Sequence, residues 1–251
     1  MSTPLLEIDG LQKAFGAVIA SENLSLDVQP GEIHAVIGPN GAGKTTLIAQ
    51  LSGEIAPDAG RIAFAGEDIT ALPVHARALR GLARSFQITS LFPRFTVLEN
   101  VALAVQAHQG HSFRFWRPAW RDPALIEPAK ETLRRVAMTR REDVPAGTLA
   151  HGEQRQLELA MALAGQPRLL LLDEPTAGMG HEDSVRMVDL LLDLKQEVAM
   201  LLIEHDMDAV FRLADRITVL VYGRAIASGS PETIRTDPEV RRAYLGEEEP
   251  A

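Results

Sequence analysis

The sequence predicts an α/β fold in which a mostly parallel β-sheet is covered by helices on both faces, with a helical insertion in mid-chain. Short apolar runs alternate with helical patterns in both halves, as in strand–helix–strand units. A glycine-rich loop at residues 38–46 joins one apolar run to a helical pattern. Residues 97–165 show helical patterns and no convincing strand. We therefore expect an α/β core with a mostly parallel sheet, an N-terminal antiparallel β subdomain and an inserted helical subdomain.

The first third of the chain is rich in short β patterns separated by turn residues. The turn Pro57-Asp58-Ala59-Gly60, for example, precedes an apolar run that is typical of a strand. Helical periodicity then takes over, broken by an irregular stretch at residues 110–123. The expected strands are residues 5–9, 24–28, 32–37, 61–65 and 82–86, and the expected helices are residues 97–107, 124–138 and 153–164.

Alternation returns after residue 165. The runs Leu169–Leu172 and Val198–Ile203 are continuously apolar, as expected for strands that are buried on both faces. A helical pattern follows each run, near residues 182–195 and 207–214, and strands at 216–221 and 224–228 form a hairpin through Tyr222-Gly223. We predict one domain, residues 1–246, with a core of 1–87 and 166–246, a helical subdomain of 88–165, and an acidic tail of 247–251.

Composition narrows the function classes. Apolar residues make up 46% of the 251, enough for a sizeable core, but no run is long enough to span a bilayer. The net charge of −9 argues against a broad nucleic-acid surface, so no nucleic-acid partner is expected. The absence of cysteine excludes disulfides and thiolate metal sites. The beginning of the chain lacks the pattern of a signal peptide, so we expect a cytoplasmic protein.

The loop GPNGAGKTT is the most informative motif. It fits the phosphate-binding pattern G-x-x-x-x-G-K-[ST] and lies between an apolar strand and a helix, where backbone N–H groups and the helix start attract a polyphosphate. The lysine would reach the β- and γ-phosphates, and the hydroxyl of Thr45 would bind Mg²⁺. The predicted ATP-binding residues here are Gly38, Pro39, Asn40, Gly41, Ala42, Gly43, Lys44, Thr45 and Thr46.

A second group of polar residues follows the ends of other predicted strands. The run Leu169–Leu172 ends in Asp173, which would hold Mg²⁺ at the carboxyl edge of the sheet, and in Glu174, which is placed to act as general base on water. His205 follows the next apolar strand and could contact the γ-phosphate. Gln87 follows the strand at 82–86 and could sense Mg²⁺ or the water.

Together these residues resemble the ATP-binding subunits of ABC transporters, over Leu5–Gly246 and with all motifs in the family's order. GPNGAGKTT looks like the Walker A motif and LLLLDE like the Walker B motif with its catalytic Glu174. Gln87 matches the Q-loop, and His205 matches the switch histidine. Phe15 matches the aromatic residue that stacks on adenine. LAHGEQRQLEL matches the signature motif, whose counterparts here are Ala150, His151, Gly152 and Glu153.

Finer matches, such as GRIAFAGEDIT, DEPTAGM and the closing AYLG, resemble the larger ATPase subunit of importers of branched-chain amino acids. Relatives with similar sequences belong to importers of urea, amides or aromatic acids. The resemblance implies a head-to-tail ATP sandwich of two ATPase subunits, in which each site uses the partner's signature motif. It also implies membrane permease subunits, docked at the Q-loop and the helical subdomain, and a solute-binding receptor that acts through the permease. The protein would then lie on the inner face of the membrane.

Two motifs depart from the family pattern. The usual serine of the signature is Ala150, which cannot donate a hydrogen bond to the partner's γ-phosphate, and the usual carboxylate of the D-loop is replaced by Gly180. A hydrogen bond to a charged group contributes about 1.5–3 kcal/mol. His151 either substitutes as a donor or has a structural role. We expect a distinct ATPase partner rather than a second copy, and unequal hydrolysis at the two sites.

Other interpretations remain open at this stage. The aromatic and basic stretch at residues 111–121 is expected to pack on the inserted helices, with a membrane subunit or a lipid headgroup as the alternative. The first rival function is a non-transport ABC ATPase that switches soluble partners; the single ATPase half and the lack of a coiled-coil insertion argue against it. The second is a nucleotide-binding scaffold with little turnover, against which Glu174 and His205 argue.

Overall fold

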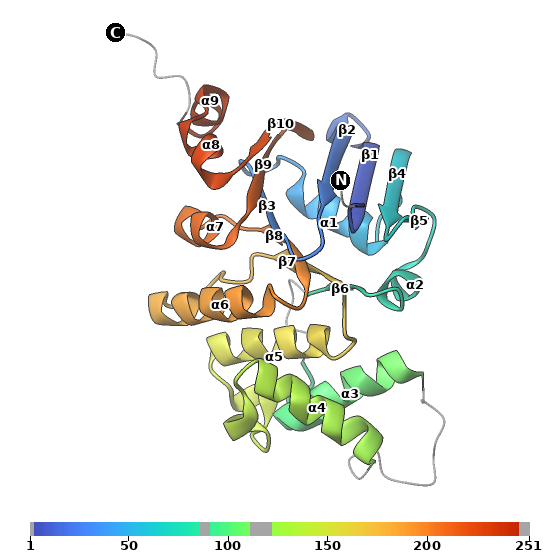
Figure 1. Ribbon diagram of the computed structural model, residues 1–251, viewed down its shortest axis with the longest axis vertical. Coiled ribbons are helices and arrows are strands. Elements are labelled where there is room, and N and C mark those ends of the chain that lie inside the picture. The colour runs from blue at the N-terminus through green and yellow to red at the C-terminus, as the bar shows by residue number, and fades with distance from the viewer. Residues whose placement is uncertain (1–2, 86–90, 111–121, 246–251) are drawn as a thin grey trace.

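The computed structural model describes residues 3–85, 91–110 and 122–245. Its centre is a six-stranded sheet in the order β10-β9-β3-β8-β7-β6, in which only β10 runs antiparallel to its neighbour (Figure 1). The fold class predicted from the sequence is confirmed. The strands are β3 (Ile33–Ile37), β6 (Leu82–Arg84), β7 (Leu169–Asp173), β8 (Ala199–Ile203), β9 (Arg216–Val221) and β10 (Arg224–Gly229).

A second, antiparallel sheet has the order β2-β1-β4-β5. Its first two strands are longer than predicted, because register shifts after Ile8 interrupt the alternation of buried and exposed residues that would have marked a longer strand. Gly10 sits within this irregularity with φ 59°, a backbone conformation that favours glycine. The strands are β1 (Leu6–Phe15), β2 (Val18–Val28), β4 (Ala59–Phe64) and β5 (Glu67–Asp68).

Helices cover the six-stranded sheet on both faces. Leu169 and Leu171 pack with the helix α1 (Lys44–Ser52) and the antiparallel sheet, whereas Leu170 and Leu172 point into a core with the other large helices. This two-sided burial explains why β7 and β8 are continuously apolar. The other face is covered by α6 (His181–Leu194), α7 (Met207–Leu213) and, beyond them, the inserted helices.

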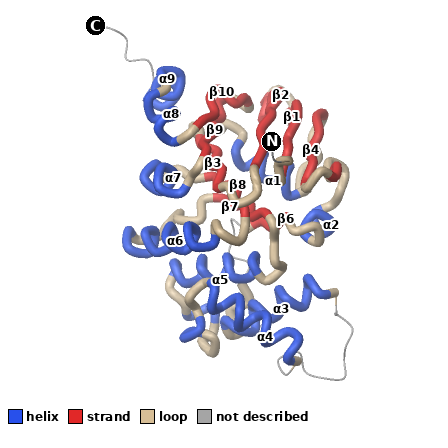
Figure 2. Tube along the Cα trace, viewed as in Figure 1, coloured by secondary structure: helices blue, strands red, loops and turns tan. Residues whose placement is uncertain are grey.

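The inserted helices lie together on one side of the six-stranded sheet (Figure 2). Thr96 begins the first of them with a capping box, since its hydroxyl accepts from Glu99 N and the Glu99 carboxylate accepts from Thr96 N. The helices are α3 (Val97–Gln109), α4 (Pro123–Arg135) and α5 (His151–Leu163), with 3₁₀ turns at Thr139–Arg141 and Ala146–Thr148. Among residues 91–110 and 122–163 there is no strand.

Three short helices were not predicted: α2 (Val74–Ala78), α8 (Pro231–Thr236) and α9 (Pro238–Leu245). Each is close to one or two turns long, too short for apolar periodicity to show. Within the part of the chain that the structure describes, no helix is long and apolar enough to cross a membrane. The acidic tail and the aromatic stretch at 111–121 lie outside the described residues.

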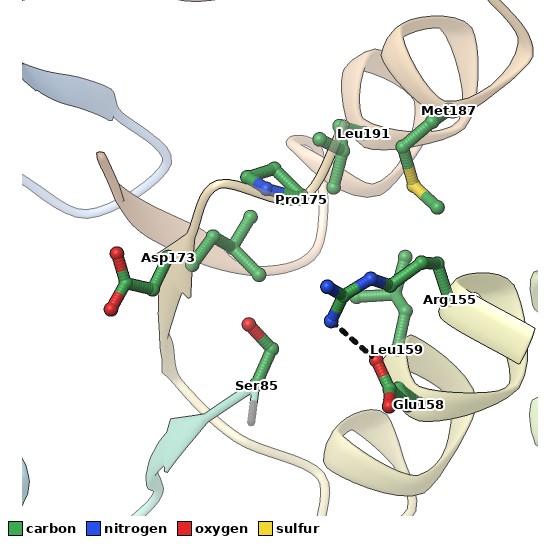
Figure 3. Close-up of a pocket in the computed structure, with 9 residues that line it drawn as sticks. Ser85, Arg155, Glu158, Leu159, Asp173, Pro175, Met187 and Leu191 are labelled. Atoms are coloured by element: carbon green, nitrogen blue, oxygen red, sulfur yellow. Dashed lines mark hydrogen bonds and ion pairs between the residues drawn. The ribbon is translucent and has the colours of Figure 1, made fainter. Parts of the chain in front are cut away.

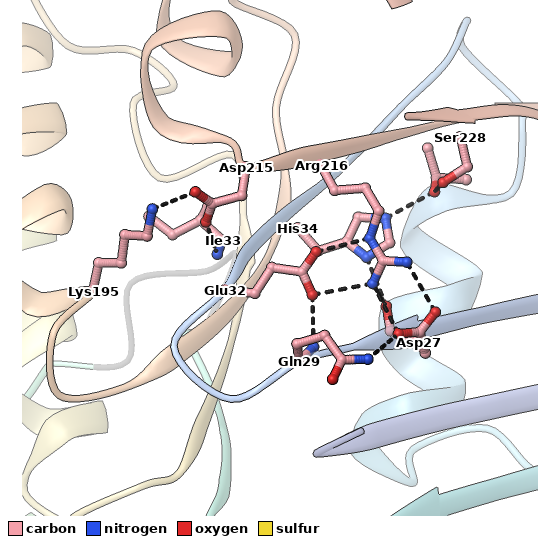
Figure 4. A network of polar contacts seen from close by, with 10 residues as sticks. Asp27, Gln29, Glu32, Ile33, His34, Lys195, Asp215, Arg216 and Ser228 are labelled. Atoms are coloured by element: carbon pink, nitrogen blue, oxygen red, sulfur yellow. Dashed lines mark hydrogen bonds and ion pairs between the residues drawn. The ribbon is translucent and has the colours of Figure 1, made fainter. Parts of the chain in front are cut away.

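An ion-pair network joins the two sheets at the end opposite the glycine-rich loop (Figure 4). Arg216 Nη1 lies 2.9 Å from Asp27 Oδ1, and Arg216 Nε lies 2.8 Å from Glu32 Oε1. The fully buried His34 contributes two more contacts, 2.8 Å from Nδ1 to the Asp27 carbonyl and 2.8 Å from Nε2 to Thr218 Oγ1. The network ties β2 to β3 and β9 and holds the strand that leads into the loop.

Candidate functional site

Three neighbouring parallel strands end beside one another at a single edge of the sheet. β3 leads into the glycine-rich loop, β8 leads to Glu204 and His205, and β7 ends in Asp173 and Glu174. This order, β3-β8-β7, brings segments that are more than 130 residues apart in the sequence to one place. The carboxyl edge of a parallel sheet is where such folds bind ligands.

The glycines of the loop allow close backbone packing. A Cβ atom on Gly38 would lie 2.0 Å from the Leu220 carbonyl oxygen, and one on Gly43 would lie 2.1 Å from the Ala20 carbonyl oxygen. Gly43 also has φ 104°, which a larger residue would rarely adopt, and it forms the N-cap of α1. These two positions therefore require glycine, and the loop is held between β2 and β9.

Lys44 is 6% exposed and folds back over the loop. Its Nζ donates to the Gly38 carbonyl at 2.7 Å and to the Pro39 carbonyl at 3.0 Å. Burial lowers the pKa of Lys44, while the carboxylates of Glu174 and Asp173 act in the opposite direction. The ammonium group is thus poised in the loop, held by backbone oxygens that a phosphate could replace.

The remaining loop residues differ in how freely they face solvent. Thr45, at the start of α1, is exposed, and its hydroxyl has no hydrogen bond to another described residue; Asn40 and Gly41 are exposed as well. Thr46 and Pro39 are half-buried. Ala42 is buried, and its carbonyl accepts from Gly223 N at 2.9 Å, which docks the β9–β10 turn against the loop.

Asp173 is buried, and neither carboxylate oxygen has a hydrogen-bond partner among the described residues. The nearest cation is Arg84, whose Nη2 lies 3.5 Å from Asp173 Oδ2. Burial raises the pKa of Asp173, although Arg84 opposes the shift. Two unsatisfied carboxylate oxygens beside the hydroxyl-bearing start of α1 suit a hard cation such as Mg²⁺. Among the described residues, no three acidic or histidine side chains cluster as a metal site.

Glu174 and His205 are in direct contact. His205 Nε2 lies 2.7 Å from Glu174 Oε1, and both side chains are partly open to solvent. Glu174 has φ 52°, in the left-handed region that non-glycine residues rarely occupy, and its N–H donates to the Ile203 carbonyl at 2.8 Å. Backbone strain of this kind persists where the surrounding structure enforces it, often at functional positions.

Glu204 holds the segments around that pair. It is 3% exposed, and its Oε1 accepts from Thr176 N at 3.1 Å and from the Thr176 hydroxyl. Its Oε2 accepts from His205 N at 2.8 Å. One buried carboxylate therefore bridges the turn after Glu174 and the residue that contacts Glu174.

The signature residues lie at the start of α5. Ala150 is the N-cap without a side-chain acceptor, and Glu153 compensates in part because its Oε2 accepts from Ala150 N at 3.1 Å. His151 Nε2 lies 3.3 Å from the Ala177 carbonyl, over Gly178, where a Cβ would come within 3.1 Å of the imidazole. Gly152 packs on Asp183. His151 thus has a structural contact with the loop after β7 of the same chain.

Comparison with known proteins identifies the family. A family model described as "ABC transporter" matches residues 21–177. The chain belongs to the ABC transporter family. A second model, "Branched-chain amino acid ATP-binding cassette transporter", matches residues 226–250. The family and the ATPase class predicted from the sequence are thereby confirmed.

The relatives extend over the whole chain. The high-affinity branched-chain amino acid transport ATP-binding protein BraF of Pseudomonas aeruginosa is 41% identical over 98% of this chain and 100% of its own. LivG of Escherichia coli K12, which has the same description, is 38% identical over the same shares. An ATP-binding cassette of an ABC transporter, solved in its ADP conformation, superposes with a TM-score of 0.86 at 29% identity, covering 98% of this chain and 100% of the other.

Two predicted site residues of this ABC ATPase are not seen in contact with the other site residues. Gln87 lies outside the described residues. Phe15 is 49% exposed at the β1–β2 hairpin, with Lys13 Nζ 5.4 Å from its ring centre. It pairs with Val18, two residues before Ala20, whose carbonyl lies against Gly43. The hairpin end is therefore close to the phosphate loop, with an aromatic ring facing outward.

A small cavity lies behind the Walker B strand of the ABC ATPase, lined by Ser85, Asp173 and residues of α5 and α6 (Figure 3). The Asp173 carboxylate points away from this cavity, so the nucleotide would not occupy it. Inside, Arg155 Nη1 lies 3.0 Å from Glu158 Oε2, and both side chains are largely buried. This pair belongs to the packing between core and inserted helices.

Sequence reasoning missed Arg84 and Glu204. Both occupy the same kind of position as the residues that were found, since Arg84 is the last residue of β6 and Glu204 directly follows β8. The rule that polar residues at the carboxyl ends of parallel strands converge would have selected both. In this ABC ATPase Arg84 lies beside the carboxylate of Asp173, and Glu204 accepts a hydrogen bond from His205 N.

Proposed function

We propose that this chain is the Mg-ATP-hydrolysing subunit of an importer of branched-chain or related amino acids. The observation that carries the chemistry is the convergence of Lys44, Asp173, Glu174 and His205 at one edge of the sheet, next to a phosphate-binding loop. The solute class is supported by the printed functions of BraF and LivG and by the match at residues 226–250.

The roles of the residues follow from their chemistry. Lys44 would exchange the Gly38 and Pro39 carbonyls for β- and γ-phosphate oxygens. Thr45 and Asp173 would hold Mg²⁺, with Gln87 as a further contact; when bound, the ion neutralises phosphate charge. Phe15 would stack on adenine. Residues 38–46 would surround the phosphates with N–H groups, helped by the N-terminus of α1.

Hydrolysis requires a water held in line with the γ-phosphate. Glu174 would accept a hydrogen bond, and finally the proton, from that water, because its carboxylate lies half-exposed at the open edge. His205 Nε2 lies 2.7 Å from Glu174 Oε1 and would orient the carboxylate through this hydrogen bond, and the same N–H would turn to the γ-phosphate when ATP is bound. Glu204 would keep the two residues at this separation through Thr176 and His205 N.

Work on a membrane requires partners. The proposed partners are permease subunits, a solute-binding receptor acting through them, and a second ATPase subunit, so that the chain would sit on the cytoplasmic face. An apolar groove between α2, β6, α3 and α5 supports docking of a permease segment there; its lining includes Val74, Leu79, Ala104 and Met161. Leu79 is 61% exposed, as expected for a side chain that a partner covers.

The second ATPase subunit would complete each site with its own signature motif. In this chain Ala150, His151, Gly152 and Glu153 would face the partner's ATP, and Ala150 offers no hydroxyl. The site that contains this chain's Lys44 is therefore the stronger of two unequal sites in a heterodimer. The proposed division remains a core of 1–87 and 166–246, with the helical subdomain of 88–165 carrying the signature.

Transport by the reconstituted complex tests the proposal. The chain would be purified with candidate permease and ATPase partners, placed in liposomes with Mg-ATP, and assayed with receptor and radiolabelled leucine. We expect ATP-dependent uptake that is lost in Glu174→Gln and kept in Glu131→Gln, a matched change on the exposed face of α4. Uptake of an aromatic acid, an amide or urea alone would correct the solute. ATP hydrolysis that drives no uptake would instead support the rival function, a switch acting on soluble partners.

A further inference from the structure

Arg84 lies between two carboxylates of different exposure. Its Nη1 is 2.6 Å from Glu54 Oε2, and its Nη2 is 3.5 Å from Asp173 Oδ2. The Asp173 side chain has no exposed surface, the Arg84 side chain is 12% exposed, and the Glu54 side chain is 43% exposed. The guanidinium therefore balances a fully buried charge while it makes its shorter contact with a more hydrated one.

The 3.5 Å contact between Arg84 and Asp173 leaves the Asp173 oxygens available to a metal ion. Neither Asp173 oxygen accepts a hydrogen bond from a described residue, so Arg84 supplies charge without occupying the lone pairs that a metal ion would use. A buried carboxylate without any nearby cation would be strongly unfavourable. The other nearby cation, Lys44, already donates to two loop carbonyls. Arg84 is thus the side chain that makes Asp173 tolerable when no metal is bound.

Glu54 is a fixed second acceptor. It follows α1 directly, after Gly53 in the left-handed C-cap, and its N–H donates to the Ala49 carbonyl at 2.9 Å. The same helix begins at the phosphate loop. Arg84 stays close to β7 as well, since its backbone pairs with Leu171. The guanidinium can therefore shift between the two carboxylates without movement of either backbone.

We propose that Arg84 is the counter-charge of Asp173 in the metal-free site and yields Asp173 to Mg²⁺ by withdrawing toward Glu54. Arg84 would be a positioning residue, because it acts through the carboxylate of Asp173. The proposal rests on the proposed Mg-ATP site. Since two like charges repel across a shared carboxylate, Arg84 and the metal compete, and Glu54 determines the balance.

The affinity of the ADP-bound protein for a metal ion tests this competition without relying on turnover. The probe is Mn²⁺, measured by electron paramagnetic resonance with saturating ADP and with Mg²⁺ as competitor. We expect Arg84→Gln to bind Mn²⁺ roughly tenfold more tightly and Glu54→Gln to bind it roughly tenfold more weakly, the lower end of the range for changes next to metal ligands. Arg84→Lys should stay near the wild type because it keeps the charge.

A second arginine–glutamate pair provides matched controls. Arg80 Nε lies 3.1 Å from Glu67 Oε2, and both side chains are exposed. Arg80→Gln and Glu67→Gln make the same charge changes and should leave the Mn²⁺ affinity unchanged. If Arg84→Gln weakens Mn²⁺ binding, or if Glu54→Gln strengthens it, the competition is wrong. If the wild type binds no Mn²⁺ with ADP, the proposed Mg-ATP site itself fails.

Thermal unfolding gives a separate readout. Without Arg84 the metal-free protein holds an uncompensated charge at Asp173, so Arg84→Gln should lower the melting temperature by several degrees, and Mg-ADP should restore most of the loss. Glu54→Gln should show no such loss and a smaller gain with Mg-ADP. An equal deficit of Arg84→Gln with and without Mg-ADP would mean that Arg84 is merely structural. If Arg84→Gln does not fold, Glu54→Gln and Arg84→Lys still decide the question.

Discussion

His205 Nε2 lies 2.7 Å from Glu174 Oε1, although 30 residues separate the two in the sequence. The contact arises because β7 and β8 are neighbours and end together. Glu174 N–H donates to the Ile203 carbonyl, which fixes the Glu174 backbone beside the end of the strand that leads to His205. The proposed general base and the histidine that would orient it are therefore already in contact without nucleotide.

Loss of the Lys44 ammonium should abolish tight nucleotide binding. Lys44→Met removes the charge and leaves the Gly38 and Pro39 carbonyls without their donor. Because charge-assisted hydrogen bonds contribute about 1.5–3 kcal/mol each, we expect ATP affinity to fall roughly 100-fold or more, as measured by equilibrium dialysis. Lys130→Met, on the exposed face of α4, is the control. ATP affinity within threefold of the wild type would contradict the assignment.

Glu204 should matter for turnover more than for binding. Glu204→Gln keeps one acceptor oxygen but replaces the other with an amide that cannot accept, so either the Thr176 contacts or the His205 N contact is lost. We expect kcat to fall roughly 10- to 100-fold with ATP affinity nearly unchanged, and stability to fall by about 1–3 kcal/mol. Thr176→Val removes one of the same contacts and should show a smaller fall. Equal losses in kcat and in ATP affinity would indicate a general structural role.

His34 should make stability depend on pH. Burial lowers the pKa of His34, with the Arg216 charge acting in the same direction, while the Asp27 carbonyl, Glu32 and Asp27 partly oppose it. The folded state thus keeps the imidazole neutral where the unfolded state is protonated. Stability is full above the ordinary histidine pKa of 6.5 and falls as pH drops below it.

Urea denaturation at pH 7.5 and pH 5.5 measures this effect. His34→Gln retains hydrogen-bonding groups without titration and should lose less stability between the two values than the wild type. The Arg216 ion pairs lower the pKa of Asp27, so that residue contributes stability that is lost only as pH falls below 3.8. The two windows are therefore separate. An unchanged pH dependence in His34→Gln would remove His34 from the account.

Restoring serine at the signature should have two effects. Ala150 is the N-cap of α5 without a side-chain acceptor, and Ala150→Ser supplies one, which should stabilise the protein by about 1 kcal/mol. In the proposed heterodimer the new hydroxyl should also raise hydrolysis at the partner's site. Single-site turnover, measured with the other site disabled, checks this. Greater stability without greater turnover would mean that Ala150 does not limit that site.

The candidate site was predictable where its polar residues directly follow an apolar strand. Asp173, Glu174 and His205 could be found because buried strands in parallel sheets are continuously apolar and their carboxyl ends meet. Lys44 was predictable from the spacing of the phosphate loop alone. Arg84 and Glu204 were overlooked because an arginine or a glutamate at a strand end is common, and only the packing shows which ones are buried against a functional group.

The fold was predictable to a similar degree. The parts of the prediction that were wrong have physical reasons. The predictions for β1 and β2 were too short because bulges near Gly10 break the two-residue alternation of buried and exposed side chains. Helices α2, α8 and α9 span so few turns that they have no clear apolar face. The contact between His151 and Ala177 links two segments whose departures from the family pattern were read separately, and no spacing in the sequence predicts it.

The most direct test of the account is hydrolysis by Glu174→Gln in the complex with its partners, with the nucleotide content of the protein measured at the same time. The account predicts that ATP is bound with wild-type affinity and retained unhydrolysed, with turnover reduced at least 100-fold, whereas Glu131→Gln behaves as the wild type. Near-wild-type turnover in Glu174→Gln would contradict the central claim that this carboxylate is the general base.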